Sequence, residues 1–410
     1  MGQLADPSNP THAFIIRVGI LLHRFGTPSH RLERVLTQVA SSLGIQGVFL
    51  YTPTALVLSL SDETGEHTYL RRIDGGGVQV EKLIQFDDVL EKLEAGTLSI
   101  QAAQLELDAV EQAGPAHPMW LTILACAISC GAVAVFFRGS MTEIFCTLLI
   151  GLAVSVTEVL HARLRGQPGY LEPLAGLIAS VSALAVAHYV TPIDDRLVTL
   201  AALIVMIPGL RITIALTELA VGHLSAGVAR LAGASVTLLT MTVGVAIGWR
   251  IAGSWRDLPD VNSIEYQARM LPEYWQSIAM LIAPITFSIV FQARWPQWPV
   301  ISVVSVCGFL MSKYASAEWG IEVGAFCGAL TVGIGSNLYA RIRDRPALVP
   351  FIPGIIVLVP GSLGYRSLTA FLENETIAGI DFAFRMMIVA VSLVGGVLTA
   401  NVVMPPKRIL

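Results

Sequence analysis

The feature that most restricts the fold of this chain is a series of apolar runs, each close to the length of a membrane-spanning helix. Such a helix needs about 20 mostly apolar residues. Helices satisfy the backbone polar groups of these runs in lipid. Seven runs are free of charge, namely 119–137, 231–249, 274–293, 295–312, 323–340, 346–365 and 386–404. Three weaker ones are interrupted or edged by polar residues, namely 140–160, 171–190 and 197–219. The sequence therefore predicts an α-helical integral membrane protein with about ten transmembrane helices.

Charge divides the chain into two unequal parts. Residues 1–118 hold 22 of the 56 charged side chains and have a net charge of −6, whereas the other 292 residues hold 34 and have a net charge of +2. We therefore expect a cytosolic front domain, defined here as residues 13–113, before the membrane helices. Neither part has the basic excess that nucleic-acid binding requires. Nucleic acid is therefore not an expected partner.

The front domain has the patterns of a small α+β domain. Helical periodicity covers residues 13–25 and, after Gly26-Thr27-Pro28, continues to about Leu43, with Thr27 as the expected N-cap. The later segments are three strand-like runs and two amphipathic helices, at 47–51, 55–60, 67–73, 79–94 and 99–112. No GxSxG, HExxH or Walker motif is present, and no paired CxxC motifs suggest a metal. We expect a coupling, regulatory or assembly module, with no enzymatic activity, metal or cofactor.

The membrane part contains an internal repeat. The hexapeptide at 204–209, IVMIPG, returns 152 residues later at 356–361 as IVLVPG. The same offset, without a gap, pairs Leu216 with Leu368 and Gly227 with Gly379. We interpret residues 119–251 and 274–404 as homologous repeats of five helices each. An odd number of crossings inverts the second copy, and inverted repeats are typical of secondary transporters.

Both copies of the hexapeptide end in a Pro-Gly pair, Pro208-Gly209 and Pro360-Gly361, inside an expected span. Proline removes a helical hydrogen bond, and a broken helix exposes N–H groups that attract a carboxylate. We predict that these four residues bind the substrate, the alternative being two simple kinks. Two further polar residues within a span are Ser336 and Asn337. They could bind a substrate hydroxyl or amine, or a neighbouring helix.

Ionisable residues within spans are costly and are functional candidates. Glu158, Glu218, Arg230 and Glu322 are our candidates for proton coupling or for ion pairs. Glu218 and Glu322 are favoured as the titrating carboxylates, and a Glu218–Arg230 pair at the cytosolic surface is the structural alternative. For Glu158 the alternative is a side chain that reaches the membrane interface.

The loop charges predict the orientation. With the front domain in the cytosol, the short cytosolic loops and tail hold eight Lys and Arg residues, against four in the short loops on the other side. Both ends of the chain are therefore expected in the cytosol, in a multi-pass cytoplasmic membrane protein surrounded by lipid.

Several ordered motifs resemble the threonine/serine exporter family. They are Ile207-Pro208-Gly209, Leu216-Thr217-Glu218-Leu219, Gly222-His223-Leu224, Gly26-Thr27-Pro28-Ser29-His30-Arg31-Leu32-Glu33 and Tyr51-Thr52-Pro53-Thr54. The resemblance covers about residues 13–403, in a single-chain form with both membrane halves. His223 stands where many relatives have an acidic residue.

The resemblance implies export of a small-molecule substrate, threonine or serine, driven by protons. Some relatives carry the halves as separate subunits, and such a pair is associated with export of a dicarboxylate such as succinate. A dicarboxylate exporter and a membrane-anchored metabolite sensor are the alternatives. The sequence leaves open whether the protein is a homo-oligomer.

Overall fold

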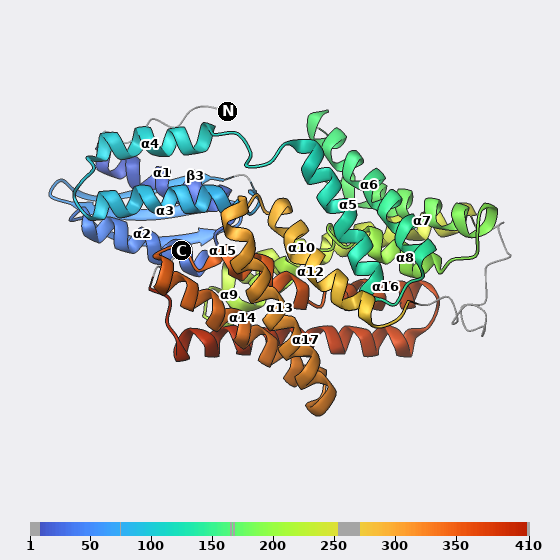
Figure 1. Cartoon of the computed structure of the whole chain (residues 1–410). Helices are drawn as coiled ribbons and strands as arrows, with labels where there is room; N and C mark the ends of the chain where they lie inside the picture. The colour runs from blue at the N-terminus through green and yellow to red at the C-terminus, as the bar shows by residue number, and fades with distance from the viewer. Residues whose placement is uncertain (1–8, 74, 165, 167–168, 253–270, 408–410) are drawn as a thin grey trace.

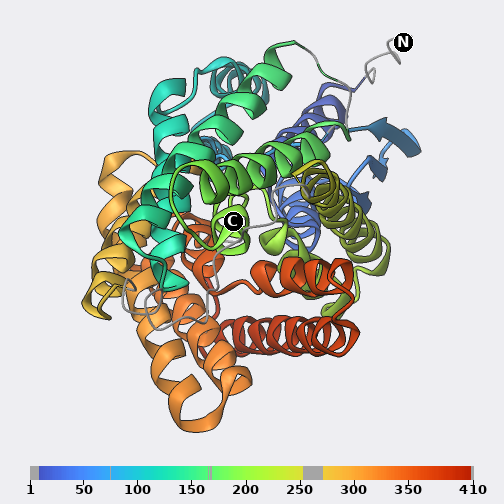
Figure 2. The same cartoon turned by 90° about the vertical axis from the view of Figure 1, so that its right-hand side faces the viewer.

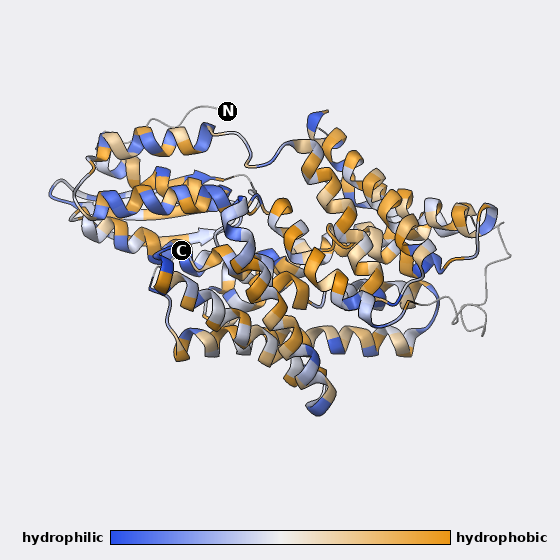
Figure 3. Ribbon diagram, in the orientation of Figure 1, coloured by the Kyte–Doolittle hydropathy of each residue, from blue (hydrophilic) through white to orange (hydrophobic). Residues whose placement is uncertain are grey.

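The computed structural model describes residues 9–73, 75–164, 166, 169–252 and 271–407. A layered α+β part at one end is joined to a larger helical part, with the first strands and helices drawn in blue at the left of Figure 1. Hydropathy separates the same two parts, since apolar residues cover the membrane helices and polar ones concentrate on the front helices and on loops (Figure 3).

The front domain is a three-stranded antiparallel sheet with helices packed against it. The elements are α1 (Pro10–Arg24), α2 (Ser29–Ser42), β1 (Gln46–Thr52), β2 (Ala55–Asp62), β3 (Gly65–Arg72), α3 (Val80–Glu94) and α4 (Ile100–Gln112), with strand order β1-β2-β3. Leu56, Leu58 and Leu60 alternate along β2 and are fully buried against Phe14 and Leu36 of the helices. Alternation of this kind gives a sheet one core face. The predicted α+β class is confirmed.

The predicted N-cap of α2 is wrong. Helix α2 begins at Ser29, Pro28 is the N-cap residue, and no side chain of the cap accepts a hydrogen bond from the helix. The Thr27 hydroxyl is buried and has no hydrogen-bond partner in the structure. Instead, the Ser29 N–H donates to Glu218 Oε1 at 2.9 Å, a carboxylate from far along the chain. Local sequence could not reveal this cap, because its acceptor comes from the membrane part.

The membrane part contains a helix in each of the ten predicted ranges. They are α5 (Met119–Phe136), α6 (Met141–Arg163), α7 (Leu171–Tyr189), α8 (Asp195–Ala202) followed by α9 (Gly209–Ala220), α10 (Leu224–Ile251), α12 (Tyr274–Val290), α13 (Trp298–Trp319), α14 (Ile321–Arg343), α15 (Leu348–Ile355) followed by α16 (Gly361–Leu372), and α17 (Thr376–Val403). Among the described residues, eight segments are long and apolar enough to cross a membrane, and α12 is a shorter apolar helix. The tenth range is the interrupted pair α8–α9.

The two halves have the same order of elements, with closely matching lengths. Helices α8 and α15 have 8 residues each, α9 and α16 have 12 each, and α10 and α17 have 28 each. Packing corresponds as well, since α9 contacts α17 and α10 contacts α16. Figure 2 shows α16 and α17, in red, lying side by side, and these helices are in contact.

Corresponding helices end at different places relative to the front domain. Glu218, near the C-terminal end of α9, contacts the front domain through Ser29. The equivalent end of α16 continues into Glu373, which pairs at 2.9 Å with Arg196 at the start of α8. The C-terminal end of α17 contacts α14, where Asn337 Nδ2 donates a hydrogen bond to the Met404 carbonyl oxygen.

Candidate functional site

The two Pro-Gly breaks meet in the middle of the membrane part. Pro208 has φ −78° and ψ 37°, and Pro360 has nearly the same values, −82° and 29°. A Cβ atom built on Gly209 would lie 2.5 Å from Val359 Cγ1, and one on Gly361 would lie 2.7 Å from Ile207 Cγ2. Since Ile207 and Gly209 correspond to Val359 and Gly361 in the repeat, the contact is reciprocal. The structure thus brings the four predicted residues of the breaks together.

Glycine is required here by the close approach of the two backbones. Each added Cβ would lie 3.1 Å from the Cα of the other glycine, which is closer than ordinary van der Waals contact. The approach places the N-terminal ends of α9 and α16 side by side. The first N–H groups of a helix have no carbonyl partner in that helix and carry a partial positive charge.

A cavity of about 550 Å³ is bounded by both breaks. Its lining includes Gly209, Pro360 and Gly361, together with apolar side chains of α5, α12 and α13 such as Phe136 and Phe287. Mostly apolar walls with a few polar groups are typical of small-molecule sites.

The polar side chains among the described lining residues of the cavity all come from the second half. They are Gln276, Ser312, Lys313, Ser316, Ser362 and Arg366. Two of them are cations, and no carboxylate is among the described residues that line the cavity. With two helix N-termini in addition, the cavity favours an anionic group.

Sequence reasoning missed Lys313 and Arg366. Lys313 is exposed and contacts Gln276 at 3.4 Å. The Arg366 guanidinium lies over the Phe137 ring, 5.0 Å from its centroid. Both Arg366 and Phe137 also line a second, more polar cavity of about 390 Å³, with Asp194 and Glu373. Its position five residues beyond the predicted Gly361 is the signal that could have indicated Arg366.

Ser336 and Asn337 are not brought to the breaks and do not line the cavity. The Ser336 hydroxyl donates to the Val332 carbonyl oxygen of its own helix. Asn337 Nδ2 donates to Asn401 Oδ1 at 3.0 Å and to the Met404 carbonyl oxygen at 2.7 Å. Asn337 therefore joins α14 to α17, as in the alternative that it bonds a neighbouring helix.

Glu218 and Arg230 form a two-contact ion pair. Arg230 Nε and an η-nitrogen lie 3.0 and 3.1 Å from the Glu218 carboxylate, which is completely buried. Tyr51 of the front domain bonds to Arg230. The pair thus lies at the junction of the front domain and the membrane part, outside the cavity lining.

The other two carboxylate candidates lie apart from this pair. Glu158 is an exposed residue of α6 within electrostatic reach of Arg211. Glu322 is exposed in the first turn of α14, where a carboxylate favours the helix dipole. Neither lines the cavity.

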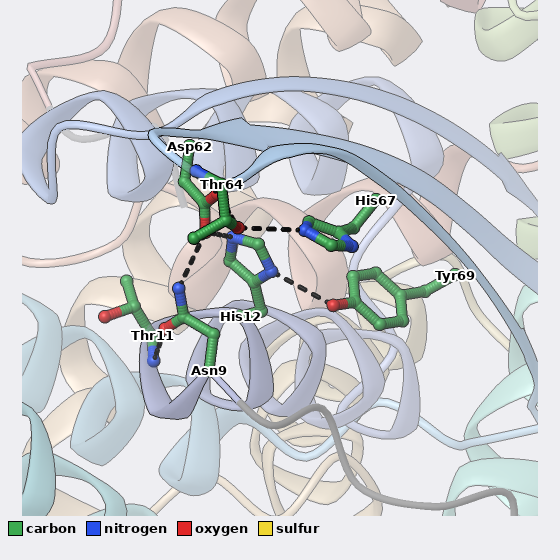
Figure 4. Close-up of polar contacts among 7 residues, drawn as sticks. All are labelled: Asn9, Thr11, His12, Asp62, Thr64, His67 and Tyr69. Atoms are coloured by element: carbon green, nitrogen blue, oxygen red, sulfur yellow. Dashed lines mark hydrogen bonds and ion pairs between the residues drawn. The ribbon is translucent and has the colours of Figure 1, made fainter.

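A second polar cluster lies at the edge of the front domain (Figure 4). His12 is fully buried, with Nδ1 3.0 Å from the Tyr69 hydroxyl and Nε2 3.3 Å from Asp62. Hydrogen bonds from the Thr64 hydroxyl and N–H lower the pKa of Asp62 to about 2, and burial lowers the pKa of His12. The cluster fastens α1 to the β2–β3 hairpin. Within the described part of the chain, no group of side chains is arranged to hold a metal ion.

The fold and the site define the class of this chain, a multi-pass helical membrane protein. Comparison with known families identifies it further. Residues 13–252 match a family model described as "Putative threonine/serine exporter", and residues 276–403 match one described as "Threonine/Serine exporter, ThrE". The chain belongs to the threonine/serine exporter family and has both halves in one polypeptide.

Curated relatives include fungal proteins called pheromone-regulated membrane protein 10. The chain is 26% identical over 377 residues to the one from Kluyveromyces lactis, which covers 88% of this chain and 39% of the relative. It is 25% identical over 405 residues to the one from Candida albicans, covering 94% and 35% respectively. The chain therefore spans less than half the length of these relatives. No solved structure matches it.

Proposed function

We propose that the protein is a secondary active exporter of small amino acids, threonine or serine, whose carboxylate binds between the N-terminal ends of α9 and α16. The observation that carries this proposal is the meeting of the two breaks at the wall of a 550 Å³ cavity. Backbone N–H groups at a helix N-terminus suit a carboxylate, and broken helices at the repeat interface are the usual substrate sites of transporters.

We further propose that the two halves form an inverted repeat. The reciprocal contacts of Gly209 and Gly361 are those expected across a local two-fold axis. The opposite placement of Glu218 and Glu373 relative to the front domain supports antiparallel halves. Exchange of conformations between such halves would alternate access to the cavity. In this arrangement the front domain and the C-terminal end lie on the cytosolic side of the cytoplasmic membrane.

Proton coupling is part of the proposal. No carboxylate is among the described residues that line the cavity, and we place the coupling group outside this lining. Of the four ionisable candidates, Glu218 is the fully buried carboxylate, and its partner Arg230 is mostly buried. A proton on Glu218 would weaken this pair and its bond to Ser29, so protonation would change the junction with the front domain.

Transport in proteoliposomes tests the proposal. Vesicles loaded with labelled threonine or serine should release it when a pH gradient is imposed, and should release much less without one. The Gly361→Ala variant, which obstructs the break, should transport slowly. Absence of efflux with either amino acid under gradients of both directions would contradict the proposal.

A dicarboxylate is the second candidate substrate, favoured by the cations Lys313 and Arg366 in a lining without described carboxylates. A dianion gains from two cations, whereas a zwitterion also needs acceptors for its amine. Unlabelled succinate and serine should be compared as inhibitors of threonine efflux. Stronger inhibition by succinate, lost in Lys313→Gln, would favour the dicarboxylate.

A further inference from the structure

A small cavity of about 30 Å³ lies between the start of α2 and the membrane helices, on the front-domain side of the breaks. The front domain contributes Pro28, His30 and Arg31, and α9 contributes Thr213 and Thr217. Helices α15 and α17 complete the lining with Phe351 and Asn401, among others. The volume is close to that of one water molecule, so no amino acid fits.

This small cavity and the large one are close neighbours. Leu210, which follows Gly209 in the first turn of α9, lines both. The large cavity also contains Gln276, Lys313 and Ile321, which belong to the helix ends away from the front domain. A line from the large cavity toward the front domain therefore passes Leu210 and ends at α2.

We propose that the start of α2, residues Pro28–Arg31, is the cytosolic gate of the transport path, and that the Glu218–Arg230 pair holds this gate closed. The inference rests on the proposed transport function and assigns a role to the front domain within it. In the structure the front domain closes the cytosolic end of the path, and opening requires α2 to leave the groove formed by α9, α15 and α17.

Polar contacts hold α2 in this position. Glu218 accepts the Ser29 N–H at 2.9 Å and is bonded through two nitrogens to Arg230, which in turn bonds Tyr51. Near the same place, a Glu33 carboxylate oxygen lies 3.4 Å from Nδ1 of His223, which directly precedes α10. The contacts of Ser29, Glu33 and Tyr51 join the front domain to one end of the α9–α10 pair. The Glu218–Arg230 pair holds two of their partners in place.

Apolar packing closes the groove. Leu348 and Ile352 of α15, together with Ala226 of α10, belong to the same buried cluster as the core of the front domain. Phe351 packs against this cluster, and the Arg31 guanidinium lies 5.9 Å from the centroid of its ring. The gate therefore contacts both halves of the membrane part.

The closed state also contains a group that favours opening. Arg31 is only 6% exposed, and burial together with the nearby Arg34 lowers its pKa to about 10. Burying a cation costs free energy. Release of α2 would return Arg31 to water, so loss of the Glu218 contacts should shift the equilibrium toward the open gate.

Thiol labelling from the cytosolic side tests the gate directly. A single cysteine replaces Thr213 in a chain whose five native cysteines are substituted, and a membrane-impermeant thiol reagent is added from that side. Labelling should be slow with Glu218 present. In Glu218→Gln and Arg230→Gln it should be faster by about tenfold or more, because each change leaves a buried partner unpaired. Asp381→Asn, which breaks an exposed pair with Arg385, is the matched control and should leave the rate unchanged.

Equal labelling rates in the parent, Glu218→Gln and Arg230→Gln proteins would overturn the proposal. If these variants aggregate, Glu33→Gln gives the same test from the front-domain side without altering a membrane helix. Labelling requires no solute, so the readout is independent of the transport assay. A protein that exports no tested solute, but whose labelling becomes faster in Glu218→Gln, would contradict the proposed function. The same result would still support the proposed gate.

Discussion

At the scale of single residues, the junction between the front domain and the membrane part depends on buried ionisable groups. His30 lies at the start of α2, with its ring 6.3 Å from that of His223. Burial is the main cause that lowers the pKa of His30 from 6.5 to about 3, and Arg31, His223, Arg34 and Arg230 lower it further. His30 is therefore neutral in the folded protein at neutral pH and at moderately acidic pH.

His30 should make the protein less stable in mild acid. As the pH falls from 6.5 toward 3, the unfolded chain binds a proton at His30 that the folded chain does not bind. This proton does not affect the free energy of unfolding well above pH 6.5. At pH 5 it lowers the free energy of unfolding by about 2 kcal/mol. Thermal unfolding in detergent between pH 8 and pH 5 should show a smaller decline in His30→Gln than in the parent. His67→Gln, on the exposed hairpin, is the control, and an unchanged decline in His30→Gln would contradict the assignment.

Charged contacts between the front domain and the membrane part should differ strongly in their contribution to the free energy of unfolding. Arg345 pairs with Asp88 where both side chains are partly exposed, so Asp88→Asn should cost less than about 1 kcal/mol. Glu218→Gln leaves Arg230 without its buried partner and should cost about 3 kcal/mol. Unfolding midpoints of the two variants, measured in the same detergent, should fall in that order. Equal decreases in the unfolding midpoint would show that burial does not determine how much Glu218 contributes to stability.

At the scale of elements, the interrupted helices place the candidate site. Helices α8 and α15 stop short of the Pro-Gly pairs, and α9 and α16 begin at the glycines. The backbones can approach at this point only because neither glycine has a side chain. The large cavity is consequently bounded by two helix starts.

Gly209→Ala should destabilise the protein and slow transport. The new methyl group would lie 2.5 Å from Val359 Cγ1, and relieving an overlap of this kind costs about 1–3 kcal/mol. Gly233→Ala is the matched control, because a Cβ atom there meets nothing within 4 Å in the middle of α10. An unfolding midpoint as high in Gly209→Ala as in the parent would show that the breaks do not pack in this way.

Asn337→Leu separates the two interpretations of Asn337. If the residue only joins α14 to α17, the variant loses the bonds to Asn401 and Met404 and about 1–3 kcal/mol of stability. The KM of the variant for threonine or serine transport should then match that of the parent, measured at a temperature where both proteins are folded. A large rise in KM with unchanged stability would restore Asn337 as a substrate ligand.

At the scale of the whole molecule, the sequence predicted the outline of the fold better than the contacts of the site. Apolar runs and periodicity located the membrane helices, and the constant offset indicated that Pro208 and Pro360 are equivalent. Neither pattern shows which helix faces which, so the sequence left open whether Asn337 binds a substrate or a neighbouring helix, and the structure shows its hydrogen bond to Asn401. Lys313 and Arg366 were missed because a cation near the end of an apolar run also fits a membrane interface. The cap of Ser29 by Glu218 was beyond reach, since no local pattern connects residues 189 positions apart.

The reciprocal contact between Gly209 and Gly361 has a consequence for the origin of this architecture. A surface that touches its own equivalent across a two-fold axis is self-complementary. An ancestral chain with one five-helix half could therefore have paired with a second copy of itself, provided that both orientations in the membrane were populated. Duplication and fusion would then fix one copy in each orientation. After such a fusion the two sides of the contact would be free to diverge, because each side then has its own sequence.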